Sequence, residues 1–598
     1  MKANKFFLGL ALIGAILTGC EKNPGQTGDY DATSYMSVSI AQAGGTRTAA
    51  IDGGFLDGSG NENTINTVDF YFYDADGNAF LFYSNANQGA GNESFVSNRY
   101  AYGSGTTGNV EDDPNNIDEL LSAVLVINHN KGNIPAYMIA VINSTVDYAN
   151  KSLSFVKNAT VSSNGVNTDG THIMTNSVYK GADGYKGADH TQIVMETPIT
   201  IENLAITEAK AKLKPVRIYV ERTAARVEVK EKDATKNLVY ATGKSFKYAG
   251  TNSTINVNAR ILGWDIVTYA NEGTLAKQIA LDGIWDAADG KINGFTWNQP
   301  GMYRSYWAVA DKKTGTNPLT KSFTWSGLLN DVTTTPGTGD IDYCLENTSL
   351  PEKNNLYVKA DDTFAEDKDI SRTNVTKVVI KAQLENASDN TPLTICNWYG
   401  SNYATVDELK AAVAQSLKNK LNKQVSGAYT PIEADDIAIV ENVGTNMKKV
   451  EVGSEDISNQ YSYEVYFTFV DPSEQWYELN ADHTSYTLVT NAIETIKGVK
   501  NARIWTNGMT YYVVNIQHLG ANEKDASEEY LPAYYGVVRN HAYEISFSDV
   551  SGFGTPVYSA TTSYPEPVTP EDIESYVAAE INILSWHVVR QEDVVLGQ

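Results

Sequence analysis

Short runs of alternating or continuous apolar residues, separated by turn signals, recur along the chain and predict β-strands. Residues 68–73 and 79–83 flank an Asp-Ala-Asp-Gly sequence, which predicts a hairpin with an Asp-Gly turn. Further predicted strands lie at 36–40, 120–128, 136–143, 216–229, 255–269 and 543–547. Only a few stretches, such as 406–421 and 488–496, have a helical pattern. The pattern therefore predicts a mainly all-β fold of β-sandwich type with a few short helices.

The most hydrophobic predicted strand lies near the C-terminal end of the sequence, at residues 576–589, after a proline-containing stretch at 551–572. Its apolar residues form two alternating sets, first Val577, Ala579, Ile581 and Ile583, then Leu584, Trp586 and Val588. The alternation changes parity at Leu584, and a β-bulge there would account for the change. Because an unpaired hydrophobic strand is an aggregation hazard, this strand needs a partner in its own chain or in another.

The N-terminal residues have the layout of a secretory signal peptide. Two lysines precede a short apolar run at 6–16, and Leu-Thr-Gly-Cys ends at Cys20. The apolar run is too short to span a bilayer, and no later stretch is long and apolar enough. The Leu-Thr-Gly-Cys sequence resembles a bacterial lipobox, in which the cysteine is acylated and becomes the mature N-terminus. The alternative is an ordinary signal peptide in which Cys20 is a coincidence.

Composition narrows the possible partners and bridges. The net charge of −26 and a pI near 4.7 argue against nucleic acid, which requires a cationic surface. The 36 tyrosines and 46 glycines suit strands and turns. Besides Cys20 there are only Cys344 and Cys396, which exclude a disulfide framework and show no metal-site spacing. A single bridge stays possible, but two small buried residues are the simplest interpretation.

The length favours two large domains. We expect a boundary near residue 230, and a loop-rich insertion in the second domain at 311–376. The predicted organisation is a signal peptide (1–19), a lipidated propeptide with an N-terminal strand (20–47), an N-terminal β domain (48–230), a C-terminal β domain (231–550), and a linker with a final strand (551–598).

The sequence offers no constellation typical of an enzyme, cofactor or metal site. The histidines are widely spaced, at His129, His172, His190, His483, His518, His541 and His587. The one Gly-x-Gly-x-x-Gly, from Gly103 to Gly108, opens onto an acidic, proline-containing segment and is better interpreted as a loop. A Ca²⁺ loop starting at Asp74 would place Asn85 where such loops carry Glu, so the hairpin turn is preferred. We therefore predict no enzymatic activity.

Arg47 is a candidate processing site. It lies in a Gly/Thr/Ala segment after the strand at 36–40, and the next arginine is Arg99. An open segment of this kind suits cleavage between Arg47 and Thr48 by an Arg-specific protease. The alternative is that Arg47 is simply a solvated loop residue.

Motifs spread over the chain resemble the Bacteroidia-type fimbrillins, in particular the Mfa-like family of major fimbrial subunits (type V pilins). They are the lipobox ending at Cys20, the strand at 34–40 ahead of Arg47, Val-Glu-Arg-Thr-Ala-Ala-Arg at 220–226, Tyr-Cys-Leu-Glu-Asn at 343–347, Tyr-Gly-Val-Val-Arg-Asn at 535–540 with Tyr543, and Ala-Glu-Ile-Asn-Ile-Leu-Ser-Trp at 579–586. The resemblance implies a two-domain, transthyretin-like pilin architecture and a cell-surface fimbrium that supports adhesion.

The resemblance also implies a mechanism of assembly. A precursor anchored in the outer membrane by lipid on Cys20 is cut after Arg47 by a trypsin-like, Arg-specific protease. The strand with Met36, Val38 and Ile40 then leaves and opens a groove, which the C-terminal strand of another copy or another fimbrial subunit fills by donor-strand exchange. Possession of both Arg47 and the terminal strand favours a stalk subunit. The competing hypothesis is a monomeric outer-membrane lipoprotein that binds glycans through exposed aromatic rings.

Overall fold

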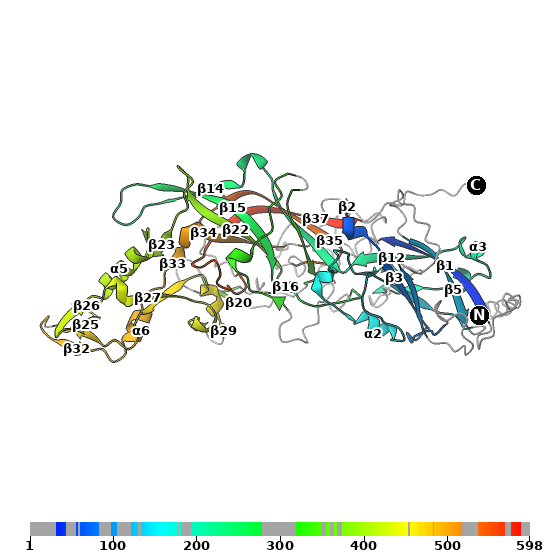
Figure 1. The fold of residues 1–598 in the computed structure, drawn as a ribbon, viewed down its shortest axis with the longest axis horizontal. Coiled ribbons are helices and arrows are strands. Elements are labelled where there is room, and N and C mark those ends of the chain that lie inside the picture. Colours follow the sequence, from blue (N-terminus) through cyan, green and yellow to red (C-terminus); the bar gives the residue numbers. More distant parts are fainter. Residues whose placement is uncertain are drawn as a thin grey trace, which may run out of the picture.

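The protein is elongated, and its β-sheets follow one another along the long axis (Figure 1). The computed structural model describes residues 32–42, 55–57, 60–82, 97–103, 121–129, 133–177, 179–180, 193–194, 196–277, 319–335, 338–347, 355–358, 364–367, 374–452, 455–481, 483–516, 518, 536–567 and 576–587. Over these residues the fold is mainly β, as the hydrophobic pattern predicts. No helix in these ranges is long and apolar enough to cross a membrane.

At one end of the molecule, eight described strands form the first sheet. Its order is β4 (Arg99–Gly103), β3 (Thr67–Tyr73), β6 (Tyr137–Ile142), β8 (Met174–Asn176), β12 (Val216–Arg222), β1 (Ala32–Gln42) and β5 (Leu121–His129), with β11 (Thr197–Pro198) paired beside β6. Both faces are covered, because alternation in β3 places Phe70 and Phe72 in one hydrophobic cluster and Tyr71 and Tyr73 in another. The second cluster also contains Leu153 of helix α2 (Leu153–Lys157).

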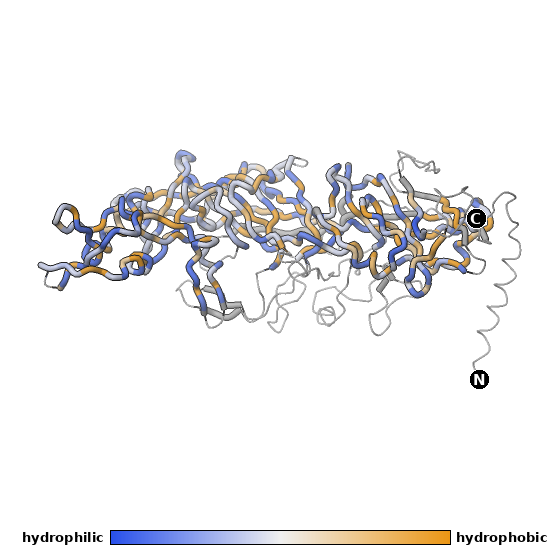
Figure 2. Tube along the Cα trace, turned by 60° about the horizontal axis from the view of Figure 1, so that its bottom comes forward, coloured by the Kyte–Doolittle hydropathy of each residue, from blue (hydrophilic) through white to orange (hydrophobic). Residues whose placement is uncertain are grey.

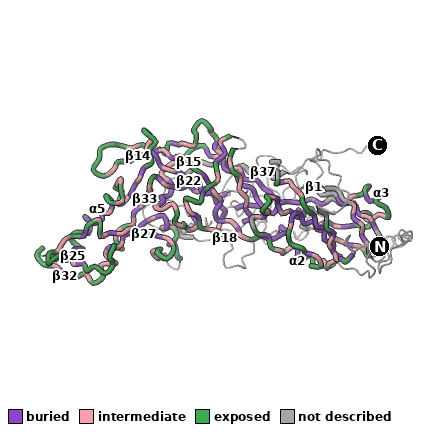
Figure 3. The backbone as a smooth tube through the Cα atoms, viewed as in Figure 1, coloured by how far each residue is buried: buried purple, intermediate pink, exposed green. Residues whose placement is uncertain are grey.

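The middle of the molecule is a sandwich of two sheets. The second sheet has the order β18 (Leu319–Thr320), β16 (Tyr269–Ala270), β19 (Ile341–Leu345), β13 (Ala224–Glu231), β35 (His541–Ser551), β37 (Tyr576–His587) and β2 (Phe55–Asp57). The third has the order β14 (Val239–Phe246), β15 (Ile255–Val267), β22 (Lys377–Asn386), β34 (Met509–Asn515) and β36 (Thr555–Pro556). One core joins them, with Val227 and Ile545 from the second sheet and Ile380 from the third. Figure 3 shows the buried residues along these central strands.

The far end of the molecule is a separate unit with its own core, inserted between β22 and β34. Its elements are β23 (Ile395–Trp398), β24 (Ser401–Tyr403), α5 (Val406–Leu417), β25 (Asn422–Val425), β26 (Ala428–Pro431), β27 (Ile437–Glu441), β28 (Glu451–Val452), β29 (Glu455–Asp456), β30 (Val465–Phe469), β31 (Trp476–Leu479), β32 (Tyr486–Leu488), α6 (Ala492–Lys497) and β33 (Arg503–Trp505). Thr405 caps α5, whose Leu409, Val413 and Leu417 are buried at helical spacing.

Short elements complete the described chain, and hydrophobic and hydrophilic residues alternate along its trace (Figure 2). The paired short strands are β7 (Thr160–Val161) with β17 (Gly273–Thr274), β9 (Tyr179–Lys180) with β10 (Ile193–Val194), and β20 (Asn355–Val358) with β21 (Phe364–Asp367). Helix α3 spans Glu208–Ala211. The 3₁₀ helices are η2 (Gly60–Asn63), η4 (Ser163–Gly165), η5 (Ile201–Asn203), η6 (Ala234–Lys236), η8 (Trp325–Gly327), η9 (Ala434–Asp436), η10 (Gly444–Asn446), η11 (Ser458–Tyr461) and η12 (Thr506–Gly508).

Three predictions of secondary structure need correction. The run at 216–229 is not one strand, because it divides at Thr223 into β12 of the first sheet and β13 of the second. The predicted hairpin keeps its turn, but residues 79–82 pair only through isolated bridges at Ala79 and Phe82. The helix predicted at 488–496 begins later, at Ala492, because Leu488 belongs to β32. The domain boundary near residue 230 stays a prediction; the chain passes from the first sheet to the second at Thr223.

Candidate functional site

β1, which carries the predicted leaving strand, is an interior strand of the first sheet. It runs antiparallel to β5 and parallel to β12, so both of its edges are hydrogen-bonded. The side chains of Met36 and Val38 are fully buried in the core that β5 and β12 share. The backbone of Ile40 pairs with Ile218 on one side and Leu121 on the other, while its side chain lies outside the described part of the structure.

The neighbours of β1 would form an apolar groove if that strand were absent. Leu125 and Ile127 on β5, and Ile218 and Val220 on β12, are all buried in the same cluster as Met36. Removing an interior strand leaves two unpaired strand edges above such a floor, and unpaired edges bind extended chains. Without β1, the first sheet would therefore present an apolar groove between β5 and β12.

The C-terminal strand β37 is paired within its own chain. It lies in the second sheet between β35, to which it is antiparallel, and β2, to which it is parallel (Figure 1). In the register with β35, Ala579, Ile581 and Ile583 stand opposite Phe547, Ile545 and Tyr543, and the latter three side chains are fully buried. Val577 stands opposite Val550, Leu584 opposite Ala542, and Trp586 opposite Leu56 of β2.

The bulge expected at Leu584 is wrong. The register between β37 and β35 is continuous from Ala579 to Ser585, and the shift lies on β35, between Phe547 and Asp549. The extra residue on the partner strand absorbs the irregularity at the other end of the pairing. Val588 lies beyond the described end of β37, and Cys20, Arg47 and Thr48 also lie outside the described residues.

A buried charged cluster at the junction of the first and second sheets was not predicted. Arg222, at the end of β12, is 1% exposed and donates from Nε to the carbonyl of Glu62 at 2.9 Å. The Glu62 carboxylate accepts a hydrogen bond from the Tyr343 hydroxyl at 2.7 Å and lies 3.4 Å from Nε of Arg226. Burial lowers the pKa of Arg222 to about 9, against the opposing effect of Glu62. The sequence did carry a signal for this cluster: Arg222 shares the alternation of the apolar residues in β12. An arginine buried in this way requires an acidic partner.

A second buried ion pair brings two sequence motifs together. Nε of Arg539 lies 2.7 Å from the Glu346 carboxylate, and both side chains are almost fully buried. Asn347 and Val537 pair through backbone hydrogen bonds in both directions. The motifs at 343–347 and 535–540 therefore lock together beside the N-terminal end of β35.

The buried cysteines lie in hydrophobic cores, and the buried histidines contact neighbouring groups. Nδ1 of His518 contacts the Tyr543 hydroxyl at 2.8 Å, and Nδ1 of His541 contacts the carbonyl of Arg539. Burial, reinforced by Arg222, lowers the pKa of His172 to about 3, and burial raises the pKa of Cys396 to about 12. Cys344 and Cys396 are unbridged and buried in different cores.

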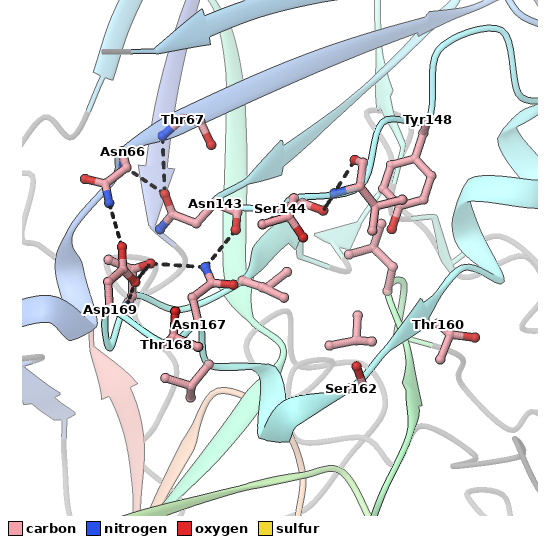
Figure 4. A pocket seen from close by; sticks show the side chains of 17 residues that line it. Asn66, Thr67, Asn143, Ser144, Tyr148, Thr160, Ser162, Asn167, Thr168 and Asp169 are labelled. Atoms are coloured by element: carbon pink, nitrogen blue, oxygen red, sulfur yellow. Dashed lines mark hydrogen bonds between the residues drawn. The ribbon is translucent and has the colours of Figure 1, made fainter.

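A polar pocket of about 530 Å³ lies beside the first sheet (Figure 4). Several side chains that line the pocket bond to one another's residues. The Asn143 side chain accepts hydrogen bonds from the backbone N–H groups of Asn66 and Thr67, and the Asn167 side chain donates a hydrogen bond to the Asn143 carbonyl. Asp169 accepts from the side chain of Asn66. Within the described ranges, no group of three His, Cys, Asp or Glu residues could hold a metal. At the Asp74 turn, Oδ1 accepts from the backbone of Asp76 and Asn78, which suits a turn.

Residues 503–592 match the sequence model of the family described as major fimbrial subunit protein type IV, fimbrillin, C-terminal. The matched region runs from β33 to beyond β37 and so includes the paired strands β35 and β37. The match confirms the resemblance to the fimbrillins over this part of the chain and supports a role as a fimbrial subunit at the cell surface.

Similarity of this chain to individual known proteins is low. A search of curated protein sequences finds no match. A fimbrilin from Porphyromonas gingivalis W83 aligns at 13% identity over 94% of this chain and 99% of its own, with a TM-score of 0.33. The tip fimbrial protein Mfa3 from Porphyromonas gingivalis aligns at 8% identity over 93% and 100%, with a TM-score of 0.30. A fimbrial assembly protein from Parabacteroides distasonis aligns at 13% identity over 60% and 97%, with a TM-score of 0.23. Scores this low carry no argument about structure or function.

Proposed function

Because residues 503–592 match the C-terminal region of the fimbrillins, we propose that this chain is the precursor of a fimbrial stalk subunit that polymerises by strand exchange. The observation that carries the proposal is the interior position of β1, between β5 and β12, only a few residues upstream of Arg47. The precursor is tethered to the outer membrane by lipid on Cys20. A trypsin-like protease then cuts between Arg47 and Thr48, and β1 leaves with residues 20–47.

β37 of another copy refills the first sheet. The vacated position offers hydrogen-bonding edges on both sides and a floor built from alternate side chains of β5 and β12. A strand with alternating apolar residues fits such a position, because main-chain bonds give affinity and alternate side chains give register. Ala579, Ile581 and Ile583 have the same spacing of two as Met36, Val38 and Ile40.

The energetic balance explains why processing is needed. Each large buried side chain contributes about 1.5–3 kcal/mol, but β37 is already paired within its own chain. Moving it gains little while β1 fills the groove. Once β1 is gone, the open groove in one subunit can be closed by the strand of the next. Because head-to-tail donation does not close on itself, the product is a filament.

The test is N-terminal sequencing of protein sheared from cells, together with gels of unboiled and boiled samples. We expect a Thr48 terminus, and high-mass ladders that disappear on boiling. Arg47→Ala should abolish both, while the matched control Thr46→Ala should leave both intact. A lipidated Cys20 terminus with monomer only would refute the proposal.

One observation favours a second candidate, a monomeric outer-membrane lipoprotein that binds glycans. On the four-stranded sheet of the far-end unit, the rings of Tyr429 and Tyr486 stack at 4.1 Å, and the ring of Tyr477 meets Tyr429 at 5.0 Å. All three side chains are partly exposed. The Cys20-terminated monomer described above is the outcome that would favour this candidate.

A further inference from the structure

β2 has one strand partner in the described part of the chain, and that partner is β37. Phe55, Leu56 and Asp57 pair in parallel with Ser585, Trp586 and His587 (Figure 1). Since β37 is parallel to β2 and antiparallel to β35, β2 is antiparallel to β35 and lies two strand positions from it, with β37 between them.

The proposed function, on which this inference rests, leaves a vacancy in the second sheet. When β37 passes to another subunit, β35 keeps β13 on one side but loses its partner on the other side along most of its length. Tyr543, Ile545 and Phe547 of β35 belong to the core of the sandwich and are fully buried beside β37. A bare edge next to these side chains would bind any available extended segment.

We propose that the newly released N-terminal segment, residues 48–57, moves by one strand position and pairs with β35 in place of β37. The movement is one inter-strand spacing, about 4.8 Å, and it preserves the antiparallel sense. Cleavage after Arg47 therefore serves both sheets, opening the first and supplying the strand that reseals the second.

The length of the segment matches the gap. Ser585 pairs with both Phe55 and His541, so Phe55 takes the position opposite His541 when β37 is gone. Continuing that register backwards sets Ile51 opposite Ile545. It brings Thr48, the new terminus, level with Ala578, where the regular register on β35 ends. The cut after Arg47 thus leaves enough chain to span the regular part of β35.

The residues that follow this segment are fixed next to the start of β35. Glu62, five residues after Asp57, is bound by Arg222 through its carbonyl and by Tyr343 through its carboxylate. Nη1 of Arg222 also donates to Oδ1 of Asn540, the residue immediately before β35, at 3.3 Å. A short segment attached to Glu62 has a high effective concentration at the edge of β35 that β37 leaves. Before cleavage, Thr48 is instead tied through residues 43–47 to β1 in the other sheet.

One pairing in the new register opposes the movement. Asp52 would stand opposite Glu544, and like charges across a strand pair are unfavourable. However, Nζ of Lys230 lies 2.6 Å from the Glu544 carboxylate on the neighbouring strand β13 and offsets the charge. Ala49 opposite Phe547 and Ala50 opposite Ser546 are neutral pairs in the same register.

A cysteine pair in the full-length chain tests the movement. Ala50→Cys and Ser546→Cys are directly opposite in the proposed register. In the precursor β37 occupies the position beside Ser546, and a strand beyond β37 lies about 9.6 Å from β35, too far for a disulfide, whereas neighbouring strands are within reach. The control pair is Ala49→Cys with Ser546→Cys, whose Cβ atoms point to opposite faces. Each protein is followed before processing, and after processing and assembly, on non-reducing denaturing gels and by peptide mass mapping.

We expect an intramolecular disulfide in the assembled protein in large excess over the control pair, and none in the precursor. Ladders without that disulfide would overturn this inference and leave the proposed function standing. A disulfide joining two chains would assign the edge of β35 to another copy, and a disulfide already present in the precursor would also overturn the inference. Failure to form ladders at all would instead overturn the proposed function.

Discussion

Met36→Ala should destabilise the precursor but leave the assembled fibre unchanged. The Met36 side chain is fully buried in the core of the first sheet, and its truncation leaves a cavity there. Met→Ala changes at such positions cost about 2–5 kcal/mol. With a denaturant slope of about 2 kcal/mol per M, the urea midpoint of the precursor should fall by about 1–2.5 M. In the proposed fibre the same residue has left with the propeptide.

The matched control is Met138→Ala on β6. Met138 is equally buried and lies in the same cluster, but β6 stays in the subunit after processing. Urea unfolding of the precursor, followed by far-UV circular dichroism, should show both variants destabilised. Loss of ladder bands with increasing temperature should show only Met138→Ala fibres weakened. If Met36→Ala weakened the fibre as much as the control does, β1 would still be present and the strand-exchange argument would fail.

Three further predictions concern stability. Burial and the neighbouring Asp342 raise the pKa of Asp265 to about 7. The stability that this carboxyl contributes is therefore present at low pH and is lost as the pH rises through about 7. Asp265→Asn should remove that part of the pH dependence of the urea midpoint. The pKa of His172 is lowered instead, so its contribution is present at neutral pH and is lost below about 6.5. When the pH falls from 7 to 5, the free energy of unfolding of the unsubstituted protein should fall by about 2 kcal/mol more than that of His172→Gln, as measured in urea titrations. Gly508 has φ +73° and its missing Cβ would meet the Leu384 carbonyl, so Gly508→Ala should cost more than about 1 kcal/mol; an unchanged melting temperature would contradict this.

Local patterns predicted individual strands well. Alternation placed a strand at 68–73, where β3 spans Thr67–Tyr73, and another at 576–589, where β37 spans Tyr576–His587. Period-two alternation is a local consequence of burying one face of a strand, so it can be detected without knowing the partner. The sequence could not give the partners themselves. The parallel pairing of β1 with β12 joins residues far apart in sequence, and no local signal encodes it.

The separate unit at the far end was missed for a different reason. Its composition resembles that of the rest of the chain, so no linker or charge run marked its limits, and the insertion was expected at 311–376 instead. Arg222 shares the alternation of the apolar residues at 216–220, and both Arg222 and Arg226 are buried against Glu62. Periodicity alone places Arg222 on the apolar face, and only the fold reveals that the acidic partner of both arginines comes from a segment over a hundred residues away.

The far-end unit leaves and rejoins the sandwich through two adjacent strands. β22 and β34 are antiparallel neighbours, with Gln383 paired to Met509, so the whole unit occupies the place of a hairpin loop. Its size, surface and sequence can therefore change without disturbing the register of the sheet that bears it. Under the proposed function, this unit can change while the strands that exchange between subunits stay the same. For the same reason, this loop position offers a place to graft a foreign sequence for display on the proposed filament.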